Sequence, residues 1–170
     1  MNACCSSREA MMLDPKLVSL PRDGRQSETA LAVARGARRL LRALNYATLT
    51  ELTLASGRRA DIIALTAGGD IHIVEIKSSV ADFRADSKWT EYRDFCDRFY
   101  FAVPHDFPVE LIPGETGLII ADAYGAEINR DAPVHCLAAA RRRVVLLRFA
   151  QAAANRLHAL GDPEGAYRDD

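Results

Sequence analysis

Hydrophobic residues recur at helical spacing over residues 28–44 and alternate with polar residues in the segments that follow. Ser27 is a suitable N-terminal cap for the first segment, whose apolar side chains return every three or four residues, so an amphipathic helix is predicted there. Three apolar runs come next, over residues 46–54, 59–66 and 70–78, with glycine-containing turns between them. Strand-like runs separated by such turns predict an antiparallel meander of three strands.

After the three strands, the hydrophobic pattern predicts a further helix, two more strands and a helical C-terminal region. The predicted elements are a helix over residues 80–95, strands over 98–103 and 117–122, and one or two helices over 137–160. The order helix, three-strand meander, helix, strand predicts one α/β domain over residues 27–160, with a central mixed sheet flanked by helices. Residues 1–26 lack periodicity and 161–170 are polar, so they are expected to form a flexible N-terminal arm and a polar tail.

The net charge of −1 excludes a uniformly basic nucleic-acid binder, so any such surface is local. Of the 22 basic residues 19 are Arg and three are Lys. Arg suits bidentate phosphate contacts, although genomic base composition explains the bias equally well. No apolar window is long enough to span a membrane, and no C-x-x-C pair occurs. A cytoplasmic protein with free thiols and no membrane contact is therefore expected.

Three charged residues stand inside the strand-like runs. Glu75 and Lys77 are two apart and share one face of their strand. A hairpin turning at Gly68-Gly69 pairs residues whose numbers sum to about 137, which places Asp61 opposite Glu75 to Lys77. Both carboxylates are thus expected at one end of the hairpin, with the amine beside them.

Converging carboxylates are suitable ligands for a hard divalent cation, Mg²⁺ with Mn²⁺ as a substitute. Asp61 and Glu75 would bind the metal, and the backbone carbonyl of Ile76 would add an oxygen. Lys77 would orient or deprotonate a metal-bound water and stabilise charge on a phosphoryl group. The alternative is a plain ion-pair cluster at a solvent-facing sheet edge.

The stretches GRRADIIAL, VEIKSSVADFRADSKWTEYRDFCDRFYFAV and GLIIADAYG resemble the MmcB family of bacterial DNA repair proteins. The sequence also resembles the PD-(D/E)xK nuclease superfamily, through Asp61 and the Glu75-Ile76-Lys77 signature. Ala60 stands where the superfamily name has Pro, a position that shapes only the turn into the strand. The resemblance implies a restriction-endonuclease-like core and a metal-dependent nuclease, with Asp61 and Glu75 as ligands and Lys77 as the catalytic amine.

The resemblance also implies two auxiliary residues. A first-helix Glu often joins the metal site in such nucleases, and Glu28 matches by position; its alternative role is that of an acid in the first turn of a helix. A polar residue of the second helix often assists as well, which singles out Lys88.

Several residues are candidates for DNA contact. Arg35 and Arg39 belong to a basic stripe on the first helix, which is either a phosphate-binding surface or an ordinary solvated face. Arg59 could reach the scissile phosphate or neutralise Asp61, and Ser78 could contact phosphate or end its strand.

These observations favour a divalent-metal-dependent DNA nuclease acting in repair. Two alternatives stay open: a DNA-binding repair factor that is catalytically silent without a partner, and a structural interaction module. DNA is the expected partner. The sequence is also compatible with a homodimer and with repair-protein partners, which it does not identify.

Overall fold

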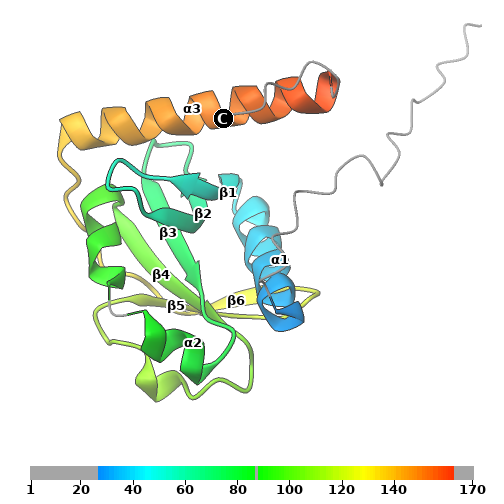
Figure 1. Ribbon diagram of the computed structural model, residues 1–170. Coiled ribbons are helices and arrows are strands. Elements are labelled where there is room, and N and C mark those ends of the chain that lie inside the picture. Colours follow the sequence, from blue (N-terminus) through cyan, green and yellow to red (C-terminus); the bar gives the residue numbers. More distant parts are fainter. Residues whose placement is uncertain (1–26, 87, 163–170) are drawn as a thin grey trace, which may run out of the picture.

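The computed structural model describes residues 27–86 and 88–162 and shows a six-stranded mixed sheet with helices on both faces (Figure 1). The strands follow one another across the sheet in chain order. They are β1 (Ala47–Thr53), β2 (Arg59–Leu65), β3 (Ile71–Ile76), β4 (Arg98–Val103), β5 (Gly117–Ala121) and β6 (Ala126–Arg130). The helices are α1 (Glu28–Ala43), α2 (Val80–Ala85) and α3 (Ala139–Gly161), with 3-10 helices η2 (Trp89–Phe95) and η3 (Val109–Leu111).

The meander predicted for the first three strands is confirmed. β1 pairs with β2 and β2 with β3 in antiparallel fashion, whereas β3, β4 and β5 are parallel neighbours. Gly69 in the turn between β2 and β3 has φ 88°, a left-handed conformation that glycine adopts without steric cost. The carboxyl ends of β3, β4 and β5 therefore lie at the same edge of the sheet.

Helix α1 covers one face of the sheet. Its cap is Ser27, whose hydroxyl accepts a hydrogen bond from the N–H of Ala30 at 3.1 Å. Gly36 permits a close approach to the β5–β6 turn, since a Cβ there would lie 2.2 Å from the carbonyl oxygen of Gly125. The apolar stripe of the helix buries Val33 and Leu41 against this face.

The second face is covered by α2, η2 and α3. Its core contains Ile73, Phe99 and Phe101, with Tyr92 of η2 and Val145 of α3 packed into the same cluster. Burial of this aromatic and aliphatic surface is the main stabilising term for the domain.

A partly buried ion pair fastens the start of α3 to the sheet. Arg142 donates to both carboxylate oxygens of Asp97, at 2.6 and 2.7 Å, and one of those oxygens also accepts from the N–H of Ile71 at 2.7 Å. This bidentate arrangement fixes the helix against the first residues of β3 and β4.

The structure departs from the predicted elements at two places. The helix expected over residues 80–95 is divided into α2 and η2, because the chain leaves the helix after Ala85. Strand β6 was not predicted, since its sequence AEINR lies at the sheet edge and lacks an apolar run. The C-terminal region, predicted as one or two helices, forms the single helix α3.

The predicted N-terminal arm lies outside the described residues, as does the tail beyond Asp162. Within the described ranges, no helix has the length and apolar character needed to cross a membrane.

Candidate functional site

Where β2 and β3 separate, the side chains of two acids accept hydrogen bonds from backbone N–H groups of the facing strand. The backbone pairing of these strands ends at Ile62 and Val74, one residue from the register expected from the Gly68-Gly69 turn. Beyond it, Glu75 Oε1 accepts from the N–H of Asp61 at 3.2 Å, and Asp61 Oδ2 accepts from the N–H of Ile76 at 2.8 Å. Each carboxylate thus satisfies a backbone donor beside the other acid, and the two acids are held together.

Burial dominates the electrostatics of this pair. Glu75 retains only 4% of its exposed surface. Burial, followed by the charge of Asp61, raises the pKa of Glu75 well above its usual value, while Lys77 opposes the shift. The pKa of Asp61 is also raised, mainly by burial, against the effects of the Ile76 N–H and Lys77. Two acids that are costly to ionise together would gain from a bound cation.

The amine of Lys77 points from the end of β3 toward the segment after α2. Lys77 is 5% exposed, and its Nζ lies 2.7 Å from Oδ2 of Asp86. Asp86 therefore neutralises and positions the buried ammonium. This contact was not expected from the sequence, because it depends on how the chain turns after α2.

Tyr92 of η2 closes the buried side of the pair. Its hydroxyl donates to the carbonyl oxygen of Arg59 at 3.0 Å. Burial and the nearby charges of Glu75 and Asp61 raise the pKa of Tyr92. The neutral phenol consequently packs beside both carboxylates and supports the start of β2.

The donor set fits a hard divalent cation. Two carboxylates converge, and the carbonyl of Ile76 opens toward Asp61, because the N–H and C=O of one strand residue point to the same side. No group of three His, Cys, Asp or Glu suited to holding a metal occurs within residues 27–86 and 88–162. Two acids plus a backbone oxygen suit Mg²⁺, which retains several waters.

The backbone of β1, the strand on the other side of Asp61 from β3, is strained at one residue. Thr50 pairs with Ile62 and Leu52 with Ala60, so Glu51 occupies the position across from Asp61. Glu51 has φ 52°, which costs a non-glycine residue about 1–3 kcal/mol. Such strain is concentrated at functional sites, and here it accompanies the break in regular pairing around Asp61.

A family model for MmcB-like DNA repair proteins matches residues 18–164. The chain belongs to the MmcB-like DNA repair protein family. This membership indicates a role in DNA repair.

The MmcB-like chain also resembles the solved structure of a protein of unknown function from Silicibacter pomeroyi. The two are 48% identical with a TM-score of 0.81, and the alignment covers 85% of this chain and 99% of the other. A search of the curated proteins finds no match.

The two auxiliary residues lie outside the carboxylate pair of this MmcB-like chain. Glu28 is an exposed acid in the first turn of α1 and is not gathered with Asp61 and Glu75 into a three-ligand group. Lys88 has an exposed side chain, and its backbone N–H donates to Oδ1 of Asp86 at 3.2 Å.

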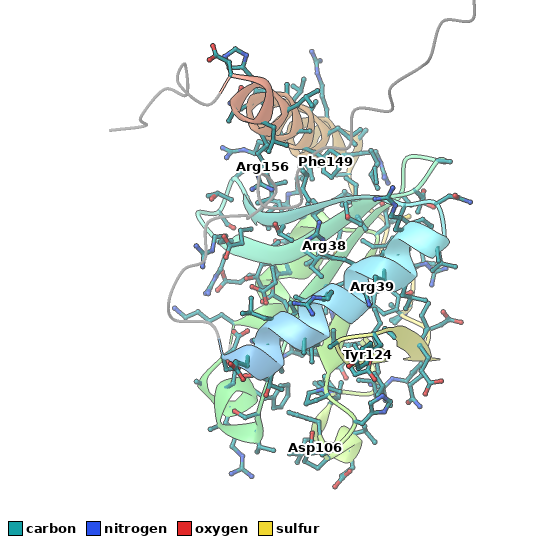
Figure 2. The ribbon with its side chains drawn as sticks, turned by 90° about the vertical axis from the view of Figure 1, so that its right-hand side faces the viewer. Arg38, Arg39, Asp106, Tyr124, Phe149 and Arg156 are labelled. Carbon is teal, nitrogen blue, oxygen red and sulfur yellow. The ribbon has the colours of Figure 1, made fainter. Side chains whose placement is uncertain are left out.

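The candidates for DNA contact differ in how free their side chains are. Arg35 is exposed on α1. Arg39 donates to the carbonyl oxygens of Ala123 and Tyr124, both at 2.9 Å, and so holds the β5–β6 turn against α1 (Figure 2). Arg59 lies 3.7 Å from a carboxylate oxygen of Glu51.

Ser78 precedes Ser79, the N-cap of α2, and is bonded to an acid in the first turn of that helix. Its N–H and its hydroxyl both donate to Oδ2 of Asp82, at 3.0 and 3.3 Å. This arrangement fixes the chain between β3 and α2, directly after Lys77.

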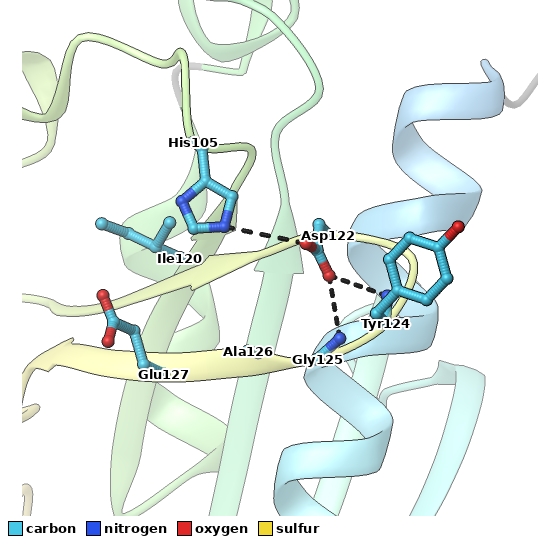
Figure 3. A pocket seen from close by; sticks show the side chains of 7 residues that line it. All are labelled: His105, Ile120, Asp122, Tyr124, Gly125, Ala126 and Glu127. Carbon is cyan, nitrogen blue, oxygen red and sulfur yellow. Dashed lines mark hydrogen bonds and ion pairs between the residues drawn. The ribbon is translucent and has the colours of Figure 1, made fainter.

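A separate hollow lies on the β5–β6 side of the same sheet edge (Figure 3). Its lining includes His105, Asp122, Tyr124 and Glu127, and the imidazole Nε2 of His105 lies 3.9 Å from Oδ2 of Asp122. None of the predicted site residues lines it, so it is distinct from the carboxylate pair.

Proposed function

We propose that this chain is a divalent-metal-dependent DNA nuclease that hydrolyses phosphodiesters during DNA repair. The observation that supports this best is the hydrogen bonding that holds half-buried Asp61 beside buried Glu75, with the charge of Lys77 acting on both carboxylates. We also assign the domain to the restriction-endonuclease-like PD-(D/E)xK architecture. Its order of helix, antiparallel meander, helix and parallel strand agrees with that assignment.

Asp61, Glu75 and the Ile76 carbonyl would hold Mg²⁺, or Mn²⁺ in its place. The bound ion would supply Lewis acidity and lower the pKa of a coordinated water. Lys77 would orient the attacking water and stabilise negative charge on the phosphate. Asp86 would act through Lys77, whose ammonium it contacts at 2.7 Å.

The DNA backbone would lie along α1 and the start of β2. Arg35 and Arg59 are exposed, so we assign the main phosphate contacts to them. Arg39 and Ser78 would add contacts while keeping their bonds to the β5–β6 turn and to Asp82. Glu28 and Lys88 would act from the rim of the site rather than in it.

A cleavage panel tests the proposal. The purified full chain is offered single-stranded, duplex, flap and junction DNA with Mg²⁺, Mn²⁺ or chelator. Glu75→Gln, Asp61→Asn and Lys77→Met should each reduce metal-dependent cleavage by about 10²–10³-fold. Glu110→Gln, an exposed acid on η3, is the matched control and should leave the rate unchanged.

A second candidate is a DNA-binding repair factor that needs a partner for catalysis. Two observations favour it: within residues 27–86 and 88–162 the donor set holds two carboxylates and no third ligand, and Lys77 is paired with Asp86. Salt-dependent DNA binding without cleavage of any substrate, under either metal, would support this function and contradict the nuclease.

A further inference from the structure

Helix α3 exposes an apolar stripe on the side that faces away from the sheet. The helix crosses over one end of the domain (Figure 1), and Phe149 and Arg156 point from it toward the sheet (Figure 2). On the outer side, Leu147 is 54% exposed and Leu157 is 71% exposed. Ala150 and Ala154 between them are exposed as well.

The outer residues follow the spacing of a coiled-coil seam. Steps of four, three, four, three and four residues lead along the outer side, through Arg143, Leu147, Ala150, Ala154, Leu157 and Gly161. Alternating steps of three and four keep side chains on one narrow stripe of a helix. The stripe therefore has the geometry needed to pack against another helix.

This stripe is symmetric about Ala152, which packs inward against the core. Leu147 and Leu157 are equally distant from Ala152, and so are Ala150 and Ala154. Exposed Val144 and Leu160, 42% and 53% exposed, flank the stripe at equal distances too. A helix with this symmetry is complementary to an antiparallel copy of itself.

We infer that the outer face of α3 is a homodimer interface, in which two copies of the helix pack antiparallel about a two-fold axis near Ala152. Leu147 of each copy would pack against Leu157 of the other. The small side chains of Ala150 and Ala154 would meet at the axis, where they let the two helices approach closely.

Charge favours the antiparallel direction. Arg143 has no ion-pair partner among the residues that the structure describes, and it would face the end of the opposing helix at Gly161 and Asp162. A helix C-terminus carries partial negative charge and attracts a cation. A parallel pair would instead place Arg143 against a second Arg143.

The other arginines of α3 do not oppose this arrangement. Arg148 and Arg156 bond to carbonyl oxygens of Thr53 and Glu51 in β1, so they point toward their own domain. Arg141 pairs with Asp94 at 3.0 Å. The interface is consequently apolar along its centre and charged only at its ends.

Sedimentation equilibrium of the full chain tests the inference. The wild type should be a concentration-dependent dimer. Leu147→Glu and Leu157→Lys should each weaken dimerisation by about tenfold or more, because each places an unpaired charge against a leucine. Leu111→Glu on η3, where Leu111 is 37% exposed, is the matched control and should dimerise like the wild type.

A charge pair then tests the direction of packing. In an antiparallel dimer the double variant Leu147→Glu/Leu157→Lys sets Glu against Lys twice, so it should regain the dimer that both single variants lose. Circular dichroism confirms that each variant is folded. A wild type that is monomeric up to millimolar concentration, or a double variant no better than the single ones, would overturn the inference.

Discussion

The ammonium of Lys77 and the carboxylate of Asp86 meet at 2.7 Å, with the Lys77 side chain 6% exposed and that of Asp86 21% exposed. Because the ammonium is more deeply buried than the carboxylate, removing the one or the other should lower the free energy of unfolding by different amounts. Asp86→Asn leaves a buried ammonium without its counter-ion and should lower the free energy of unfolding by about 3 kcal/mol. Lys77→Met leaves a carboxylate that water can reach, so its loss should be smaller. Urea denaturation of both variants measures the difference, and equal losses would contradict it.

Much of this site follows from the sequence. Side chains two apart share a strand face, and a glycine turn sets the register of a hairpin, so Asp61 and Glu75 could be placed together before the structure was known. The same reasoning could not identify Asp86 or Tyr92 as neighbours of the acids. Their positions depend on where the chain leaves α2 and begins η2, which tertiary packing decides.

Strand β6, at the edge of the sheet, could not be predicted from the sequence either. Strand β6 is mostly exposed, and its sequence AEINR contains a single large apolar residue, Ile128, which is itself exposed. Its pairing with β5 includes a register shift between Leu118 and Ile119. A strand that is held mainly by backbone hydrogen bonds to its neighbour, with few buried side chains, has little hydrophobic pattern from which it could be predicted.

Stability should depend on pH through the carboxylate pair. The folded-state pKa of Glu75 lies well above its usual 4.5, and that of Asp61 above its usual 3.8. Between the usual and the raised values the folded protein binds more protons than the unfolded chain, so the free energy of unfolding falls as pH rises from about 4. The fall ends once the pH exceeds the raised values. Urea midpoints across this range, without divalent cation, measure it.

Glu75→Gln removes one of the two titrating carboxyls and should flatten this pH dependence. Glu110→Gln, which changes an exposed acid, should leave it intact. Added Mg²⁺ should also restore stability at neutral pH in the wild type, because a ligand that binds only the folded state stabilises it. Identical pH profiles for the wild type and Glu75→Gln would show that the pair does not govern the dependence.

Tyr92→Phe should affect both stability and the site. It removes the donor to the Arg59 carbonyl, a bond of 3.0 Å, and leaves a partly buried acceptor unsatisfied. The expected loss is about 1–3 kcal/mol. The metal concentration for half-maximal thermal stabilisation should rise too, because the start of β2 carries Asp61. Phe95→Leu, a change in the same 3-10 helix away from the acids, is the control for general loosening. A purely structural role for Tyr92 would lower the melting temperature without changing the metal dependence.

The two candidate arginines of α1 should behave differently in DNA binding. Arg35 is exposed, so Arg35→Gln should weaken binding to all sequences and reduce the slope of log K against log salt by about 0.9, the effect of one lost phosphate contact. Arg39 bonds to the carbonyl oxygens of Ala123 and Tyr124. Arg39→Gln should therefore also lower the melting temperature, because it releases the β5–β6 turn from α1. Fluorescence anisotropy at several salt concentrations, paired with thermal melts, separates the two effects. An unchanged salt slope for Arg35→Gln would remove α1 from the DNA-binding surface.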